Sequence, residues 1–371
     1  MSDTQLRATA PAAAHGIRET GPQFPPVEGH VLLVGGYGAG NLGDEAILCG
    51  LLSALPPSVT TLTVVSHDPT ETVADHADEP PDGVDLRAVR PTPGALFHHL
   101  LAVDAVVVGG GGIFSRYMGP YAAKLPAFAL AAIALGKPVH WAAVGVYEST
   151  PKRVVRPLVA ALARSDSVTV RDPASLDTLT RWGVPNVRLV DDPATWLSAS
   201  PTNGRTLLAD AGVDPDRPVL AIAARRVADP DRSNRLFEAY REIAATYAAR
   251  GWQLVYLPFC RHPSESVERD QQVCVALAAR CGGRVLPVAT ATDLLDVVAA
   301  CDALVATRLH AMLFAHVAET PFVAVAYATK VQSLLDELGH ADSGVALADV
   351  SGAKLLAGLE RATARVEVDT P

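Results

Sequence analysis

Short apolar runs alternate with longer Ala- and Leu-rich segments along the first half of the chain. Val, Leu and Ile dominate the runs, as is typical of buried strands, at residues 30–34, 61–66, 105–108, 138–144, 167–170 and 187–190. The segments that separate most of these runs have the length of helices. Strands that alternate with helices predict a parallel sheet with helices on both faces.

The alternation stops at a polar segment and then resumes. Residues 198–217 are rich in Pro, Gly and Asp, so we interpret them as the linker between two domains. A second series of strands is expected at 219–223, 253–257, 284–287, 303–305 and 322–325. Helices are expected near 235–249, 266–280, 291–300 and 309–317. We therefore predict an α/β protein with two doubly wound, Rossmann-like domains, at 30–197 and 218–371, which face each other across a cleft.

The two ends of the chain carry weaker patterns. Residues 1–29 contain Pro22, Pro25 and Pro26 and are expected to form a flexible leader. They hold no apolar run behind a basic start, so no secretory signal is expected, and the other apolar runs are shorter than a membrane span. We expect a cytoplasmic protein without a membrane span, and its last helix can pack back onto the rest of the chain.

Composition narrows the class of protein further. A chain of 371 residues that is 49% hydrophobic can build two ordinary domains. The net charge of -9 argues against a nucleic-acid partner, because it leaves no basic surface for phosphate backbones. The five cysteines are widely spaced and form no CxxC pair, so we expect no metal site and reduced, mostly buried thiols.

A glycine-rich loop follows the first strand. In VLLVGGYGAGNLGDEAIL, five glycines precede a predicted helix whose first turn carries Asp44 and Glu45. Gly38, Asn41 and Gly43 belong to the same loop, which leaves room for close approach to the backbone. Sugar hydroxyls need hydrogen-bond acceptors, and the two carboxylates suit them. An alternative is that Asn41, Asp44 and Glu45 only cap the helix, and the two roles can coexist.

The same loop fits the G-x-G-x-x-G pattern of dinucleotide-binding proteins. Gly38, Gly40 and Gly43 provide the glycines, and Asp68 after the next strand would be the acid for the ribose. A pyrophosphate, however, binds the positive end of a helix, where Asp44 and Glu45 would repel it. We therefore rank an NAD-dependent dehydrogenase low.

A second glycine cluster, residues 109–112, follows the strand at 105–108. Gly110 and Gly111 would line the same edge of the cleft, and Gly145 extends this row after the strand at 138–144. The alternative is a tight turn between a strand and a helix, where glycine accepts a positive φ at low cost.

Cationic residues follow the strands of the second half. Arg225 and Arg226 come after the strand at 219–223, where either could face an anion. Arg308 and His310 follow the strand at 303–305 at the start of an apolar helix, and Lys330 follows the next strand. We expect His316 to be a core residue and His262 to be an ordinary loop residue.

Several motifs occur here in the order found in one family. They are GGYGAGNLGDEAIL, GGGG, VRDPAS, DDPATWL, PF-x-x-HP and TRLHAMLFAHVAETPFVAVAYATKV. From about residue 30 to 340 the chain resembles the polysaccharide pyruvyl transferases, whose fold is similar to that of two-domain GT-B glycosyltransferases. Two segments depart from the family pattern: AVGVYES lacks a G-x-G-x-G-P-like turn, and GGGGIFSR lacks the acid that often follows the glycines.

The resemblance implies that the second domain binds the donor and the first domain the acceptor. On the donor side it implies Arg308, Leu309 and His310, with Arg225 as the arginine after the first strand, and Lys330 adds a cation nearby. On the acceptor side it implies the residues of the two glycine-rich segments: Gly38, Asn41, Gly43, Asp44, Glu45, Gly110 and Gly111.

The implied reaction moves the pyruvyl unit of phosphoenolpyruvate onto hydroxyls of a saccharide or another polyhydroxyl acceptor, which can be lipid-linked or a cell-wall unit. Phosphate leaves, a ketal forms, and no cofactor or metal is required. His310 is the expected general acid and base, with Arg308 beside it, since an ordinary His pKa of ~6.5 allows both roles. The alternatives are a GT-B glycosyltransferase that uses a nucleotide sugar and a non-catalytic sugar-phosphate binding protein.

Overall fold

Two parallel sheets organise the computed structural model, which describes residues 18–116, 118–261 and 269–369. The first sheet has the order β1-β8-β7-β6-β5-β2-β3-β4. Its strands are β1 (Arg18–Glu19), β2 (Gly29–Tyr37), β3 (Val59–Ser66), β4 (Asp85–Val89), β5 (Ala105–Phe114), β6 (Val139–Val146), β7 (Ser167–Val170) and β8 (Val187–Val190). Its helices are α1 (Leu42–Ser53), α2 (Pro69–Asp75), α3 (Pro93–Ala102), α4 (Leu125–Ala134), α5 (Lys152–Leu162) and α6 (Pro173–Arg181), with short 3-10 turns η1 (Ala122–Lys124) and η2 (Pro193–Trp196).

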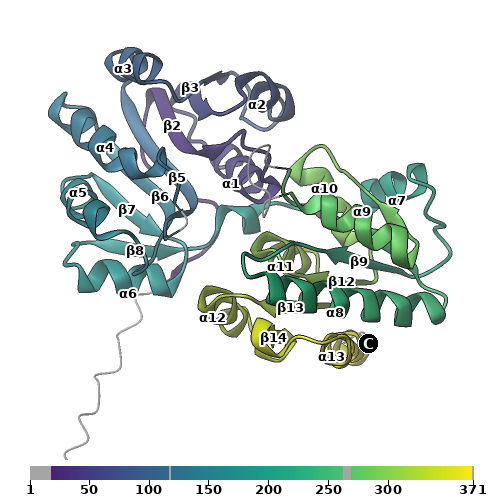
Figure 1. Ribbon diagram of the computed structural model, residues 1–371. Coiled ribbons are helices and arrows are strands. Elements are labelled where there is room, and N and C mark those ends of the chain that lie inside the picture. The colour runs from purple at the N-terminus through teal and green to yellow at the C-terminus, as the bar shows by residue number, and fades with distance from the viewer. Residues whose placement is uncertain (1–17, 117, 262–268, 370–371) are drawn as a thin grey trace, which may run out of the picture.

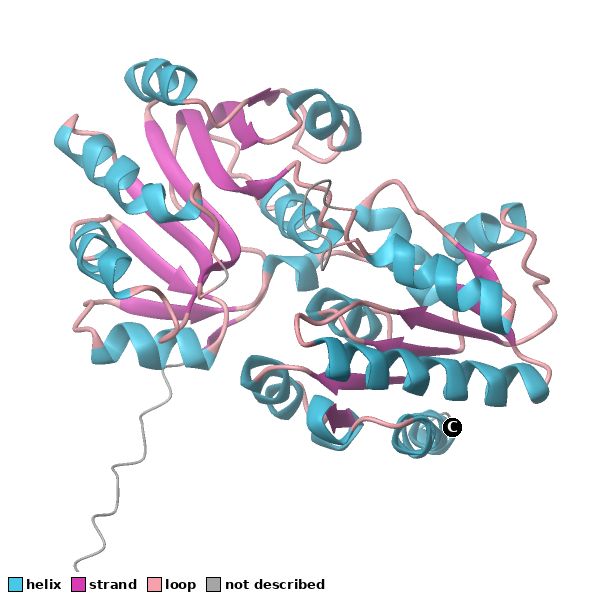
Figure 2. Cartoon of the chain, viewed as in Figure 1, coloured by secondary structure: helices cyan, strands magenta, loops and turns pink. Residues whose placement is uncertain are grey.

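The second sheet has the order β11-β10-β9-β12-β13-β14. Its strands are β9 (Val219–Ala223), β10 (Gln253–Tyr256), β11 (Arg284–Val285), β12 (Ala303–Ala306), β13 (Phe322–Ala326) and β14 (Gly344–Ala346). Its helices are α7 (Pro201–Asp210), α8 (Pro230–Ala249), α9 (Asp270–Cys281), α10 (Ala291–Ala299), α11 (Leu309–Val317), α12 (Thr329–Glu337) and α13 (Gly352–Asp369). Figure 2 shows helices on both faces of each sheet, so the predicted doubly wound architecture is confirmed.

Alternation along β2 explains how its sheet is buried on both faces. Val31 and Leu33 pack with α1, whereas Leu32 and Val34 pack on the opposite face with residues of α4 and α5. Successive side chains of a strand point to opposite faces, so a fully apolar run suits a strand that is covered twice. Among the described residues, no helix is both long and apolar enough to cross a bilayer.

The two domains share an apolar core and backbone hydrogen bonds. The core cluster that contains Ile47 of α1 continues to Met312 and Phe314 of α11. Leu42 N–H donates to the carbonyl of Phe259 (3.0 Å), and in Figure 1 α1 lies between the two sheets. The start of α1 is therefore attached to the second domain as well as to the first.

The beginning of the chain differs from the expected flexible leader. Residues 18–29 are part of the first domain, and β1 pairs with β8 at the edge of the sheet. Arg18 explains the attachment, because its side chain forms ion pairs with Asp191 (3.3 Å) and with Glu337 of α12. β1 consists of two charged residues, Arg18 and Glu19, so no apolar pattern could have predicted this strand.

Two further segments differ from the prediction. The polar segment 198–217, expected to link the domains, contains the helix α7, which packs on α10 with Gly204 against the backbone of Asp296. The second glycine cluster does not follow β5 but lies inside it, because Gly109 and Gly111 pair with β6. The last helix, α13, packs against α8 and β13 of its own domain.

Candidate active site between the two domains

Asn41 sets the start of α1 and the direction of its first acid. Its side chain caps the helix by accepting a hydrogen bond from Gly43 N–H (3.3 Å). The amide group of the same side chain donates to Asp44 Oδ2 (2.7 Å). Capping and the presentation of a carboxylate therefore coexist, and Asp44 and Glu45 occupy the first helical turn as predicted.

Asp44 lies in a small pocket that glycines make possible. The pocket measures about 140 Å³ and is lined by Gly35, Gly36, Asp44, Gly110, Gly111, Gly112, Ile113, Tyr121, Ala122 and Leu125. A Cβ at Gly111 would lie 3.2 Å from Asp44 Oδ1. Gly110 and Gly111 have φ values of 54° and 84°, which glycine adopts most readily. The two glycine-rich segments thus form one wall around one carboxylate.

Asp44 holds its proton more tightly than an ordinary aspartate. Burial raises the pKa of Asp44 to about 6, and the nearby Glu45 adds to this, while Arg171 and the Asn41 hydrogen bond oppose it. Such a pKa is typical of carboxylates that exchange protons near neutral pH.

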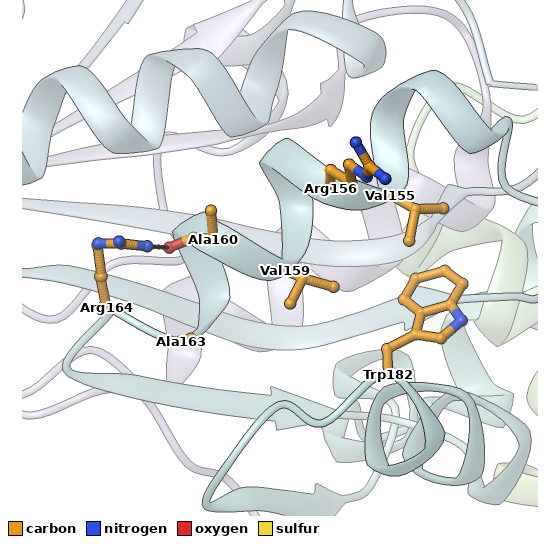
Figure 3. A pocket seen from close by; sticks show the side chains of 7 residues that line it. All are labelled: Val155, Arg156, Val159, Ala160, Ala163, Arg164 and Trp182. Atoms are coloured by element: carbon orange, nitrogen blue, oxygen red, sulfur yellow. Dashed lines mark hydrogen bonds between the residues drawn. The ribbon is translucent and has the colours of Figure 1, made fainter.

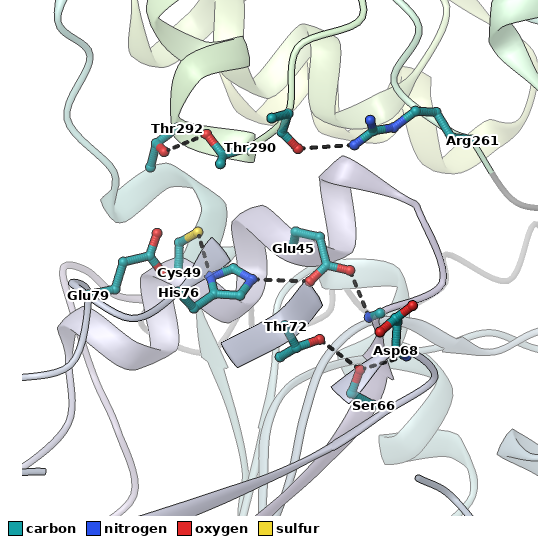
Figure 4. A network of polar contacts seen from close by, with 12 residues as sticks. Glu45, Cys49, Ser66, Asp68, Thr72, His76, Glu79, Arg261, Thr290 and Thr292 are labelled. Carbon is teal, nitrogen blue, oxygen red and sulfur yellow. Dashed lines mark hydrogen bonds and ion pairs between the residues drawn. The ribbon is translucent and has the colours of Figure 1, made fainter. Parts of the chain in front are cut away.

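Glu45 points away from this pocket. Its Oε1 accepts a hydrogen bond from Gly38 N–H (2.8 Å), and its Oε2 lies 3.2 Å from His76 Nε2. Figure 4 shows this network, in which Glu45 fixes the glycine-rich loop to the chain after α2. Burial alone would lower the pKa of His76, but hydrogen bonds to Glu45 and Glu79 raise it to about 9. Gly38 and Glu45 therefore hold the loop in place, and their expected role in acceptor binding stays a prediction.

His310 faces the first domain from the start of α11. Its ring packs on the backbone of Gly43, so closely that a Cβ there would lie 2.1 Å from Nδ1. His310 Nε2 lies 3.9 Å from Asp192 Oδ2, and only 9% of the residue is exposed. The structure therefore joins two predicted site residues, Gly43 and His310, that are far apart in the sequence.

Asp192 in turn is paired with Arg171. Arg171 NH1 donates to Asp192 Oδ2 (2.6 Å), and both side chains are 6% exposed. Burial alone would raise the pKa of Asp192, but the charges of Arg171 and His310 lower it, so the carboxylate is ionised. Asp192 caps the start of η2, because its Oδ1 accepts a hydrogen bond from Ala194 N–H (3.0 Å). An Arg–Asp pair of the first domain thus supports the histidine of the second.

Sequence reasoning did not name Arg171 or Asp192 as site residues. Both belong to motifs that carried the family resemblance, VRDPAS and DDPATWL. Each follows a correctly predicted strand, β7 or β8, at the carboxyl edge where ligands bind. That position was the signal that could have identified them.

Arg308 is engaged by a buried acid. Its Nε and one NH2 group donate to the two oxygens of Asp270 at 2.9 and 2.7 Å. Asp270, at the start of α9, also accepts from Cys260 N–H (3.0 Å) and is 1% exposed. This two-point ion pair between Arg308 and Asp270 anchors the segment after β10. A direct role of Arg308 in donor binding or catalysis stays a prediction.

The remaining donor-side residues take different positions. Arg225 is half-buried with its guanidinium 5.0 Å from the ring centre of Tyr327, whereas Arg226 is exposed. Leu309 is buried, with 9% of the residue exposed. Lys330 belongs to α12, but its side chain, like His262, lies outside the described residues. Arg225 rather than Arg226 is therefore the arginine held in a fixed position.

A larger groove lies elsewhere on the first domain. It measures about 440 Å³, runs between α5 and the end of α6, and is lined by Val155, Arg156, Val159, Ala160, Ala163, Arg164 and Trp182 (Figure 3). It shares no residue with the Asp44 pocket. None of the predicted site residues lines it.

Two Rossmann-like domains with a polar site between them define the class of GT-B-like proteins. The fold is similar to ADP-heptose LPS heptosyltransferase II from E. coli, with a TM-score of 0.53, 15% identity and coverage of 91% of this chain and 99% of that one. It is also similar to UDP-GlcNAc 2-epimerase from Methanocaldococcus jannaschii, with a TM-score of 0.59, 14% identity and coverage of 90% and 92%. At these identities the likeness concerns the fold, and the predicted fold class is confirmed.

Sequence comparison identifies the family within that class. The profile of the polysaccharide pyruvyl transferase family matches residues 41–329. Amylovoran biosynthesis protein AmsJ from Erwinia amylovora is 23% identical over 359 residues, covering 83% of this chain and 86% of AmsJ. The chain therefore belongs to the polysaccharide pyruvyl transferase family and is a transferase, as its motifs indicated.

Proposed function

We propose that this protein transfers the pyruvyl group of phosphoenolpyruvate to hydroxyls of a saccharide acceptor in the interdomain cleft. The observation that carries the proposal is the convergence of His310, Asp192 and Arg171 from both domains beside the Asp44 pocket. Family membership supports a pyruvyl transfer role, and the relation to AmsJ supports an acceptor from polysaccharide biosynthesis.

Two groups of the cleft can carry protons in this reaction. The methylene carbon of phosphoenolpyruvate must gain a proton, and an acceptor hydroxyl must lose one as its oxygen bonds to the central carbon. In our proposal His310 supplies the first proton, with ionised Asp192 stabilising the imidazolium. Asp44, with a pKa of about 6, accepts the second. Phosphate then leaves with its bonding electron pair, and a second hydroxyl closes the ketal and releases its proton.

Phosphoenolpyruvate also needs fixed cations for its carboxylate and phosphate. Arg225 is suited to this role because its guanidinium is planar and is held on Tyr327 at 5.0 Å. Lys330, at the start of α12 on the same domain, is expected to add a second cation. Arg308 stabilises the same edge through its pair with Asp270.

A thermal-shift titration tests the donor. The native protein, Arg225→Ala and its matched control Arg226→Ala are titrated with phosphoenolpyruvate, UDP-sugars and NAD, since a ligand that binds only the folded state raises its Tm. Phosphoenolpyruvate should stabilise the native protein and Arg226→Ala but not Arg225→Ala. A response to UDP-sugars alone would instead favour a glycosyltransferase, and a response to NAD alone a dehydrogenase.

A further inference from the structure

A buried polar cluster lies behind the glycine-rich loop, on the side of α1 that carries Glu45. Among the described residues, one group of His, Cys and acidic side chains is close enough to hold a metal ion: Cys49, His76 and Glu79. Their ligand atoms all lie within 4.8 Å of one another. Figure 4 shows the three side chains together with Glu45. Cys49 and His76 are buried, and the Glu79 side chain is 19% exposed.

The distances suit a tetrahedral ion. Cys49 Sγ lies 3.6 Å from His76 Nδ1. A Zn²⁺ ion with sulfur at ~2.3 Å and nitrogen at ~2.0 Å separates those two atoms by roughly 3.6 Å. Glu79 Oε2 lies 2.8 Å from the same Nδ1 and would have to withdraw by roughly 0.5 Å to become a ligand. Its partly exposed side chain has room for this shift and leaves a fourth position open to water.

The other nitrogen of His76 already has the partner that metal-bound histidines use. His76 Nε2 lies 3.2 Å from Glu45 Oε2, so a carboxylate orients the ring. Histidine ligands commonly donate their second N–H to such a group, which fixes the tautomer and makes the metal-binding nitrogen more basic. Glu45 is itself held by Gly38 N–H (2.8 Å), so the orientation is connected to the glycine-rich loop.

We propose that Cys49, His76 and Glu79 bind Zn²⁺ or another divalent cation with similar ligand preferences. This site is separate from the groups proposed to carry out pyruvyl transfer. Binding replaces the proton on His76 Nδ1 and the proton of the Cys49 thiol, so two protons leave as one divalent ion enters. The charge of the cluster is unchanged by this exchange. The ion would fasten α1 to the segment after α2, directly behind the loop that carries Asp44.

The sequence alone does not reveal this site. Cys49 and His76 are 27 residues apart, and Glu79 follows three residues after His76, which matches no common zinc motif. Only the packing of α1 against the end of α2 brings the three together. The ligand set of sulfur, imidazole and carboxylate favours zinc over magnesium or calcium, which prefer oxygen.

The test uses the full chain, stripped with a chelator and titrated with Co²⁺ in an absorption spectrometer and with Zn²⁺ in a calorimeter. Cys49→Ala removes the sulfur ligand. Cys301→Ala is the matched control, because Cys301 is also buried but its thiol donates to the carbonyl of Val297 in α10 (3.1 Å), away from the proposed site. Glu79→Gln is a second variant at a more exposed position.

The native protein and Cys301→Ala should bind one ion per chain and show a thiolate-to-cobalt charge-transfer band. Cys49→Ala should lose the band and bind Zn²⁺ at least 100-fold more weakly, and Glu79→Gln should keep the band with weaker binding. Absence of the band in the native protein, or equal Zn²⁺ affinity in Cys49→Ala and Cys301→Ala, would overturn the proposal and leave a protonated His76 between two glutamates. Because no activity is measured, this outcome is independent of the proposed transfer reaction.

Discussion

Replacement of Gly43 by alanine probes how closely the two domains fit at the site. A Cβ at this position would lie 2.1 Å from His310 Nδ1 and 2.5 Å from its Cγ. Ordinary contact requires roughly 3.5 Å, so the imidazole or α1 must move by about 1.4 Å. A displacement of ~1 Å at a catalytic group can cost about 100-fold in rate. We therefore expect Gly43→Ala to fold and to lose at least that much turnover.

The same substitution has two opposing effects on stability. Alanine favours a helix over glycine by about 0.5–1 kcal/mol. The clash with the buried imidazole costs about 1–3 kcal/mol, the usual range for overpacking. Gly43→Ala should therefore lower the free energy of unfolding by about 1 kcal/mol in the native background. In a His310→Ala background, where the ring is absent, it should raise that free energy by about 0.5 kcal/mol.

Urea unfolding of the two single variants and the double variant measures this change of sign. Gly94→Ala is the matched control, because Gly94 also occupies the second position of a helix but has nothing within 4 Å of its Cβ position. It should leave turnover unchanged. The reasoning fails if Gly43→Ala has the same effect on stability with and without His310, because the two residues would then not be in contact.

Three further substitutions test the charges of the site. Asp44→Asn should raise the free energy of unfolding at pH 8 by up to about 3 kcal/mol, because the folded pKa of about 6 exceeds the ordinary aspartate pKa of 3.8. As pH rises from 3.8 to 6, the unfolded chain loses this proton before the folded protein does, so the stability of the native protein falls. The stabilisation by Asp44→Asn, measured by urea unfolding, should therefore be about 1 kcal/mol smaller at pH 5 than at pH 8. Equal stabilisation at the two pH values would refute this reasoning. Asp192→Asn leaves buried Arg171 without its closest counter-charge and should cost about 3–5 kcal/mol, together with turnover, whereas a change below 1 kcal/mol would count against the pair. Asp270→Asn should cost about 3 kcal/mol through Arg308, measured by the same unfolding assay, and an unchanged midpoint would contradict the anchoring role.

The alternating pattern predicted most of the fold because it reflects burial directly. The runs at 219–223 and 167–170 coincide with β9 and β7, which lie inside their sheets and bury their Val, Leu, Ile and Ala side chains. The edge strand β4 was missed, because none of Asp85–Val89 is buried and the segment has no apolar run. Pairing with a neighbour, rather than the local sequence, makes such a strand.

The site could be predicted only in part, and the reason is physical. The start of α1 was predictable, because capping by Asn41 and the acids Asp44 and Glu45 are local features. Which way an acid points is not local, and Glu45 turns to His76 while Asp44 enters the pocket. Contacts between the two domains depend on how the domains pack, which no local pattern contains.

The central claim is that phosphoenolpyruvate is the donor and His310 the acid–base group. We would incubate the protein with phosphoenolpyruvate and saccharide acceptors, and follow phosphate release together with the mass of the acceptor. The native protein should release phosphate as a pyruvylated acceptor forms, and His310→Ala should be folded but slower by about 10²–10⁴-fold, the usual contribution of such a group. Transfer from a nucleotide sugar but not from phosphoenolpyruvate, or undiminished transfer by His310→Ala, would contradict the account.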